Sequence, residues 1–508
     1  MKSTLQTYAA ALYRMYCQFE ERVVAPESTD PLTRISVTEA AKQIREGKLA
    51  SYQLVKAYLD RIKHVNLYVN AVTETFDVEA LEEAQQVDEY LRKLDKESDE
   101  YRNLAEAKPL LGVPVSIKCA FQVRGHRNIS GLCHRRDLPL ATEDAPVVAR
   151  IREAGGIPHC YTNVPAACFW IESTNKINGT SASPYDTRTT CGGSSGGEGS
   201  IISAEGSLVG IGSDFGGSVR QPAMLNGIFG LKPVNTIPFD GHCPQCPDDE
   251  DLRLISGTGP FTRYAEDMAL FYSVLSHIPI PGNYLDLKLS KVLTATPTGN
   301  ALQISDDIRN ALSTVAGFLA DHFSANVEEF EFEPLEKLLK WYLNIGANEG
   351  DNSMIQIGFP NSTMSDMLQN KIKSYLGLSK VNAGSAELLD WFSAANPPAE
   401  KKRLHQELLN YRAKINNFLK NDAVIVVPAY PKTHYFHGEQ LITQNELYTT
   451  CIFNGLALSV ATAPIGLDNG GYPISVQIVA ARGNDYLLIR LQEILEKKFG
   501  GWRPAGSK

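Results

Sequence analysis

The sequence has no uninterrupted apolar run of the roughly 18 residues that a membrane-spanning helix needs. The apolar core of the N-terminal segment is short and is interrupted by Arg14, so no signal peptide is expected. Basic residues are also scarce, because 49 Lys and Arg stand against 58 Asp and Glu, a net charge of -9. Nucleic-acid binding needs a concentrated basic surface, so no nucleic-acid partner is expected. We expect an intracellular protein, either cytoplasmic or peripheral on a membrane.

Cysteines are few and dispersed. The nine thiols stand singly apart from Cys243 and Cys246, which is typical of reduced thiols in a cytosolic type of compartment. The run HCPQC, His242 to Cys246, invites a zinc site, but no second pair of Cys or His follows at zinc-finger spacing. We interpret this run as a structural loop, and we expect neither a metal nor a cofactor.

Internal repeats and linkers are missing as well, so the 508 residues are expected to form a single large domain. Ser36 and Glu39 make a capping-box pattern ahead of a short helix that Gly47 ends. The charged run 92–103 is predicted to be a loop. Further amphipathic helices are predicted around residues 54–62, 81–91, 308–319 and 335–342. Because strand-like runs alternate with these helices, the prediction is an α/β fold with a large sheet inside helical layers.

Residues 1–30 are predicted to be a separate amphipathic helical segment. One face of this helix is apolar and comprises Leu5, Tyr8, Ala9, Leu12, Tyr16 and Phe19. Docking of this face onto the rest of the protein is the favoured interpretation. A peripheral contact with a membrane is the alternative.

The stretch TTCGGSSGGEGS, Thr189 to Ser200, holds five glycines and three serines. A flexible linker is disfavoured, because two more glycine-rich turns follow with buried-type segments between them. A phosphate-binding loop is excluded, because no lysine occurs between Lys176 and Lys232. Residues 192–196 match G-x-S-x-G, but that motif needs an apolar strand before it, and PYDTRTTC is a poor one.

Histidine is absent from Cys160 through Gly241, across this whole serine- and glycine-rich region. A serine nucleophile there needs another base. Lys118 is the candidate, because it ends the strand-like run GVPVSIK where a sheet interior is expected. To be half neutral at pH 7, its pKa must fall from about 10.4 to about 7, a change worth about 4.6 kcal/mol. Burial can supply a change of that size.

Four blocks in order, GVPVSIK, TTCGGSSGGEGS, GIGSDFGGSVRQPA and GIFGLKP, strongly resemble the amidase signature family. The runs TNVPAACFWIESTN and SPYDTRTTCGGSSGGEGS look most like its fatty-acid amide hydrolase branch. The resemblance implies a mixed, twisted central sheet covered by helices on both faces. It also implies a family domain over 31–508, with a catalytic core at about 108–234 and a substrate-shaping region at about 280–440.

The resemblance assigns roles residue by residue. Ser218 matches the nucleophile, Ser194 the bridging serine after a cis peptide, and Lys118 the base, so the implied enzyme is a serine hydrolase of linear carboxamides. Where many relatives have an acidic residue after the lysine, this chain has Cys119. The backbone N–H groups expected to face the oxyanion belong to Phe215, Gly216, Gly217 and Ser218. Structural support is expected from Ser195, which would hydrogen-bond the bridging serine, and from Asp214 and Arg220, which would hold the turn.

Substrate binding is expected to involve Ser194 and Cys168, the latter by resemblance. The substrate is expected to be a small lipophilic amide. The apolar cluster predicted either to wall its channel or to be plain core comprises Met354, Ile355, Ile357, Phe359, Met364, Met367 and Leu368. One alternative is a related enzyme for small or peptide amides, or an amidotransferase A-type subunit. Another is an inactive binding protein on the same scaffold. A homodimer is a further expectation.

Overall fold

The computed structural model describes residues 2–245, 249–295, 304–346, 364–393, 396–420, 422–443, 446 and 448–507. Its centre is an 11-stranded sheet. In sheet order the strands are β1 (Val72–Thr75), β3 (Ile157–Thr162), β2 (Pro114–Lys118), β8 (Val209–Asp214), β10 (Gly257–Thr262), β9 (Phe229–Lys232), β14 (Ser459–Leu467), β15 (Pro473–Ala480), β13 (Ala423–Pro428), β11 (Lys291–Thr294) and β12 (Asn326–Glu329).

The sheet is mixed. β2 pairs in parallel with both β3 and β8, and β11 pairs in parallel with β12 and β13. The remaining neighbours in the sheet are antiparallel. Two short ribbons lie outside this sheet and pair β4 (Thr174–Asn175) with β5 (Gly179–Thr180), and β6 (Ala182–Ser183) with β7 (Asp186–Thr190).

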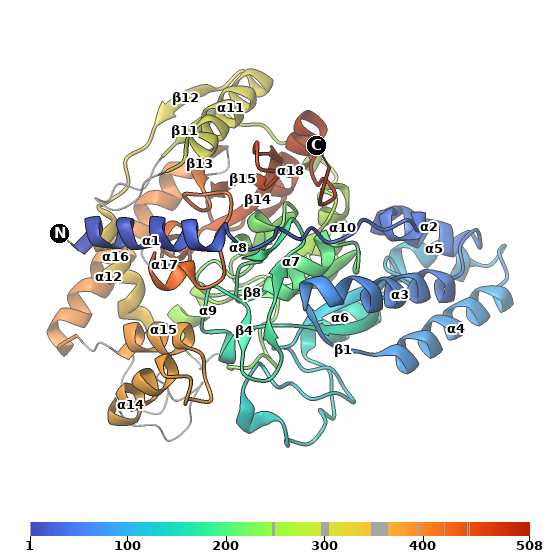
Figure 1. Cartoon of the computed structure of the whole chain (residues 1–508). Helices are drawn as coiled ribbons and strands as arrows, with labels where there is room; N and C mark the ends of the chain where they lie inside the picture. The colour runs from blue at the N-terminus through green and yellow to red at the C-terminus, as the bar shows by residue number, and fades with distance from the viewer. Residues whose placement is uncertain are drawn as a thin grey trace.

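Helices cover both faces of the sheet (Figure 1). Strand β13 shows why, because Val424 and Val426 pack into one core while Ile425 and Val427 pack into another. The first core includes residues of α2, α6, α10, α11 and α18, and the second includes residues of α9, α12, α16 and α17. Their bounds are α2 (Val37–Arg45), α6 (Pro146–Glu153), α9 (Glu250–Ile255), α10 (Glu266–Ser276), α11 (Asp306–Phe323), α12 (Leu335–Gly346), α16 (Pro398–Leu419), α17 (Tyr448–Gly455) and α18 (Asp485–Phe499). The predicted single α/β domain is confirmed.

The structure describes further helices. They are α1 (Lys2–Cys17), α3 (Ser51–Val69), α4 (Asp77–Lys93), α5 (Asp99–Ala107), α7 (Gly196–Ser203), α8 (Arg220–Leu225), α14 (Met364–Tyr375) and α15 (Ala383–Ser393). In Figure 1, helices α2 to α5 gather at one end of the molecule, while α14 and α15 lie toward the other. Within the described ranges, no helix combines the length and the apolar character that crossing a bilayer would take.

Most predicted helices are present. Ser36 caps α2 by accepting a hydrogen bond from the Glu39 N–H, as the capping-box pattern predicts. The loop predicted over 92–103 is wrong in its second half. Ser98 accepts from the Tyr101 N–H and starts α5 inside this charged run, with Leu104 as its buried residue. One apolar anchor and an N-cap therefore suffice to fold a segment whose composition suggests a loop.

The apolar face of α1 does not dock. Tyr8, Leu12, Tyr16 and Phe19 are 62–85% exposed. The helix is held by its other side, where the Tyr13 hydroxyl donates to His437 O at 2.6 Å and Arg14 pairs with Glu439 at 2.9 Å. The favoured prediction for this face is therefore wrong, because polar side chains that the periodicity ignored make the attachment.

Segments near both ends of the chain contact the β6–β7 ribbon. The Thr187 N–H donates to Val23 O, and the Tyr185 hydroxyl donates to Arg503 O at 2.6 Å. This ribbon leads directly into the turn at Gly192.

Candidate active site

Two parallel strands bring Lys118 and the serine-rich loop together. β2 ends at Lys118 and β8 ends at Asp214, and their register pairs Ile117 with Ile211. Lys118 is fully buried. Its Nζ lies 2.8 Å from Ser194 Oγ and 2.8 Å from Ser213 Oγ, with Ser213 O at 3.4 Å. The lysine therefore contacts only uncharged oxygen atoms through these bonds.

The turn that carries Ser194 connects the β6–β7 ribbon to α7. The Gly193–Ser194 peptide bond is cis. A side chain at Gly193 would place its Cβ 2.7 Å from the carbonyl oxygen of Trp170, so only glycine fits this close approach of two backbones. Because β7 belongs to a separate two-stranded ribbon and not to the central sheet, the turn is not a hydrolase elbow.

Ser195 supports a different residue from the one expected. Its hydroxyl donates to Ser213 O at 3.2 Å and accepts from the Ser213 N–H at 3.3 Å, so it does not hold Ser194. The Ser195 side chain therefore points toward β8. Its own N–H donates to Ser218 O at 3.3 Å and joins the two serine loops.

Asp214 and Arg220 brace the loop between β8 and α8. They form an ion pair of 2.9 Å in which neither side chain is exposed. The Asp214 carboxylate also accepts from the N–H groups of Gly217 (2.8 Å) and Val219 (3.0 Å). Burial opposes ionisation of Asp214, but Arg220 and Asn454 outweigh it and hold the pKa of this carboxyl well below its usual range. The two residues thus hydrogen-bond the turn.

Of the four N–H groups expected to face an oxyanion, that of Gly217 has another acceptor. The N–H of Gly217 is engaged by Asp214, which removes it from the set. Among the described residues, no acceptor takes up the N–H groups of Gly216 or Ser218. Tyr342 donates to Phe215 O at 3.0 Å, and Thr450 donates to Gly216 O at 2.7 Å, so neighbouring helices fix the orientation of these peptide groups.

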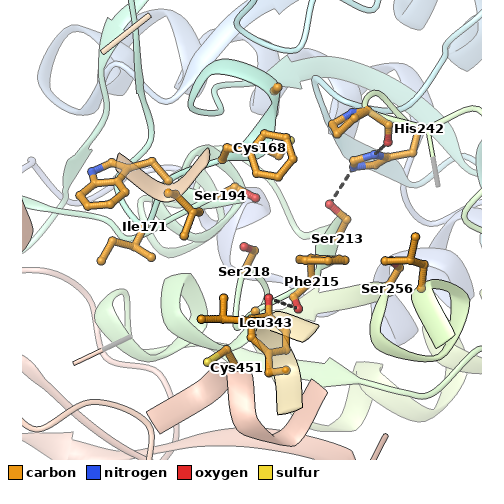
Figure 2. Close-up of a pocket in the computed structure, with 18 of the residues that line it drawn as sticks. Cys168, Ile171, Ser194, Ser213, Phe215, Ser218, His242, Ser256, Leu343 and Cys451 are labelled. Atoms are coloured by element: carbon orange, nitrogen blue, oxygen red, sulfur yellow. Dashed lines mark hydrogen bonds between the residues drawn. The ribbon is translucent and has the colours of Figure 1, made fainter. Parts of the chain in front are cut away.

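Ser218 and Ser194 both point into one cavity (Figure 2). Cys168 lines the same cavity, in a turn where it and Ala167 have positive φ angles of 61° and 53°. Within the described part of the chain, the Ser218 hydroxyl makes no hydrogen bond, so the structure does not show a direct Ser218–Ser194 link.

The rest of the cavity is mostly apolar and carries no charged side chain among its described residues. Besides the serines, its described lining consists of Ala167, Phe169, Trp170, Ile171, Phe215, Gly216, Phe239, His242, Pro244, Gln245, Leu252, Leu339, Tyr342, Leu343, Leu388, Tyr448 and Cys451, with Cys168. No Asp, Glu, Lys or Arg belongs to this described lining.

A model of the amidase family matches residues 53–489. The chain belongs to the amidase family. It is an amide hydrolase, and its most similar relatives include fatty-acid amide hydrolase 2 from Homo sapiens (34% identical, covering 93% of this chain and 91% of the relative). Fatty-acid amide hydrolase 2-A from Danio rerio is 34% identical and covers 95% of this chain and 92% of the relative. A solved structure of fatty acid amide hydrolase has a TM-score of 0.74 at 20% identity, covering 93% of this chain and 86% of that one.

Most of the apolar cluster that was expected either to wall the substrate channel or to be plain core lies outside the described residues. Residues 354, 355, 357 and 359 lie outside the described residues, as do the side chains of Met364 and Met367. Leu368 is 61% exposed and is not part of the lining. Helix α12 supplies Leu339 and Leu343 instead. The predicted helix of 335–342 is right, but its role in the cavity was missed, because periodicity does not say what a helix faces.

Three polar residues around Lys118 were not predicted from the sequence to belong to the site. Ser213 and His242 approach the lysine from β8 and from the loop after β9, and Glu198 lies within the buried helix α7. Glu198 accepts hydrogen bonds from Ser116 and from Thr162. The only sequence signal was a carboxylate inside an otherwise small and apolar run.

Burial governs the charges in this amidase site. It lowers the pKa of Lys118, while Cys168 and Asp214 act in the opposite direction. Burial raises the pKa of Glu198 to about 8 and that of Cys119 to about 11, so the thiol beside the lysine is uncharged at neutral pH. Among the described residues, no group of three or more His, Cys, Asp and Glu side chains is placed to hold a metal ion.

Proposed function

We propose that this amidase hydrolyses lipophilic carboxamides, with Ser218 as nucleophile and Ser194 and Lys118 as a proton relay. Neutral Lys118 takes the proton of Ser194, and Ser194 takes that of Ser218, whose Oγ forms a bond to the amide carbon. The 2.8 Å contact between Lys118 and Ser194 supports the first transfer. The second requires the Ser218 hydroxyl to turn toward Ser194 inside the cavity that both line.

The tetrahedral intermediate carries its negative charge on the former carbonyl oxygen. The N–H groups of Gly216 and Ser218 are the donors that support it. The proton on Lys118 returns through Ser194 to the leaving nitrogen, the C–N bond breaks, and the amine departs. Water then attacks the acyl-enzyme by the same route, which yields the carboxylic acid and restores Ser218.

The observation that carries the substrate class is the uncharged lining of the cavity. A glutamine-like substrate brings an ammonium and a carboxylate, and both need charged or strongly polar partners when they leave water. The described lining offers no charged side chain, whereas Trp170, Ile171, Leu339 and Leu343 suit an alkyl chain. The names of the relatives agree with a fatty-acid amide.

The test is a panel of primary amides of increasing acyl length, with glutamine included, in which ammonia release is measured for the wild type and for Ser218→Ala. We expect kcat/KM to rise with acyl length up to oleamide and Ser218→Ala to be inactive. Preference for glutamine would indicate the amidotransferase alternative, and preference for the shortest amides would indicate a small-amide enzyme. Equal, residual turnover by the wild type and Ser218→Ala would indicate an inactive scaffold.

We also propose that the exposed face of α1 rests on a lipid surface. Its large side chains are Tyr8, Leu12, Met15 and Tyr16, and Phe19 follows just after the helix; each is more than half exposed. An amphipathic helix of this kind lies at the boundary between headgroups and acyl chains. The competing occupant is a second copy of the chain, which would make a homodimer.

A further inference from the structure

The base faces two competing hydroxyl groups. Ser194 Oγ and Ser213 Oγ both lie 2.8 Å from Lys118 Nζ. A neutral amine has a single lone pair, so one hydroxyl at most can donate a hydrogen bond to it. Only donation from Ser194 is productive in the relay proposed above. If Ser213 donated instead, the lone pair would be occupied by a hydroxyl that has no part in the relay.

His242 decides where the Ser213 proton lies. Its Nδ1 is 2.8 Å from Pro244 O, and its Nε2 is 2.8 Å from Ser213 Oγ (Figure 2). A carbonyl oxygen can only accept, so the ring proton is on Nδ1, and the Nε2 of a neutral ring can only accept. Ser213 must therefore donate to His242, which leaves its oxygen as an acceptor toward Lys118.

The ring is held firmly in this orientation. Phe239 stacks on it with centroids 4.3 Å apart, and Phe121 meets it edge-on at 4.9 Å. His242 is also neutral at working pH, because burial and the nearby Lys118 lower its pKa to about 3. A second positive charge next to the lysine is thereby avoided.

We propose that His242 is a positioning residue for amide hydrolysis, which acts through Ser213 to keep the lone pair of Lys118 open to Ser194. This inference rests on the proposed function, because it presupposes Lys118 as the base. The same arrangement serves both states of the lysine. The neutral amine donates its two protons to Ser213 Oγ and Ser213 O, and the ammonium donates its third proton to Ser194 Oγ. Ser213 need not turn during the cycle.

The test is a set of His242 and Ser213 variants assayed for kcat/KM with oleamide. We expect His242→Leu to lower kcat/KM by about tenfold or more, the size of one misplaced hydrogen bond. His242→Gln offers an amide oxygen to Ser213 and should stay within about threefold of the wild type. The double variant His242→Leu/Ser213→Ala removes the competing hydroxyl, so it should be more active than His242→Leu and match Ser213→Ala alone.

The double variant distinguishes positioning from a purely structural role. If His242 only supported the fold, adding Ser213→Ala to His242→Leu would lower activity further, and this outcome would overturn the proposal. His159→Leu is the matched control, because His159 is also fully buried and contacts Gly206 O rather than the lysine. We expect its kcat/KM to stay near that of the wild type, and thermal melts report folding for each variant.

Failure of the inference can be told apart from failure of the proposed function. If Lys118→Ala keeps wild-type activity, the relay itself is wrong. If Lys118→Ala is inactive while His242→Leu equals the wild type, the relay stands and the role of His242 is refuted.

Discussion

In the proposed relay, Lys118 is the residue on which the chemistry depends, and its burial sets the expected direction of the pH dependence. A base must be neutral, and burial lowers the pKa of this amine from its ordinary value of about 10.4. In the wild type, kcat/KM is therefore lost as the pH falls through the lowered pKa of Lys118.

The first prediction concerns Lys118→Ala. We expect it to lower kcat/KM at pH 7 by about 100- to 10,000-fold, the usual contribution of a general base, and by far less near pH 10, where hydroxide begins to replace the amine. Ser218→Ala is the control and should be inactive at both pH values, since it lacks the nucleophile. An equal loss for Lys118→Ala across the pH range would contradict the assignment.

The second prediction concerns Gly217. Its φ is +125°, and a Cβ there would lie 2.2 Å from Thr450 Oγ1. We expect Gly217→Ala to lower the free energy of unfolding by about 1–3 kcal/mol and to lower kcat/KM as well, because the loop must shift. The control is Gly317→Ala in α11, where a Cβ meets no atom within 4 Å. It should raise the free energy of unfolding by up to about 1 kcal/mol, as read from urea melts.

Some of these residues could be found from the sequence and others could not. Lys118 could be found from its place at the end of a strand-like run, and Ser194 and Ser218 from the resemblance of their blocks to the amidase signature family. Ser213 and His242 are 29 positions apart, and their 2.8 Å contact depends on how a loop returns to β8. No local pattern encodes such a return, so the polar residues around the base were missed.

At the scale of elements, the loop between β8 and α8 is stabilised by a buried ion pair. Removing one partner of such a pair leaves a buried charge without compensation. For the third prediction, Asp214→Asn should lower the free energy of unfolding at pH 7 by about 3–5 kcal/mol, as measured by urea melts. The control is Asp60→Asn, whose ion pair with Lys56 is exposed at 52% and 53%. Its effect should be about 0.5 kcal/mol or less.

The pH dependence of this difference follows from the lowered pKa of Asp214. A carboxyl with a depressed native pKa stabilises the fold above its unfolded pKa of about 3.9, and the effect disappears as the pH falls through the native value. The gap between wild type and Asp214→Asn should therefore be complete above about pH 5 and shrink below about pH 4. A gap that grows on acidification would contradict the ion-pair argument.

The elements themselves show where local sequence is sufficient. Caps and apolar periodicity located α2, α11 and α12 because these signals act within a few residues. The same signals failed for α5, where Ser98 starts a helix in a charged run, and for the face of α1. Which side of a helix docks depends on partners such as Glu439, more than 400 positions away from Arg14 in this chain.

For the whole molecule, the central sheet was predictable as a class but not in its order. Alternation of helices and strands indicates an α/β layer structure. The order β8-β10-β9-β14 inverts the chain order of β9 and β10 and pairs β9 with β14 from a distant part of the chain, so it depends on long-range pairing rather than on any local pattern.

The remaining prediction concerns the contact with lipid. The wild-type protein should sediment with phosphatidylcholine vesicles. The double variant Leu12→Ser/Phe19→Ser should bind these vesicles at least about tenfold more weakly, because it lacks two large apolar side chains. Leu67→Ser is the control, since Leu67 is 83% exposed on α3. If the double variant bound vesicles as well as the wild type, the lipid proposal would be wrong. If the wild type were a dimer and the double variant a monomer, a second copy would be the occupant.

The β6–β7 ribbon ties the turn that carries Ser194 to segments near residues 23 and 503. Thr187 is hydrogen-bonded to Val23 and Tyr185 to Arg503. The turn that carries Ser194 comes directly after this ribbon in the sequence. A nascent polypeptide on the ribosome cannot form the hydrogen bond between Tyr185 and Arg503 until residue 503 has left the exit tunnel. If the sheet folded earlier, the turn that carries Ser194 would lack this hydrogen bond. We therefore expect amide cleavage to begin only after residue 503 has left the exit tunnel.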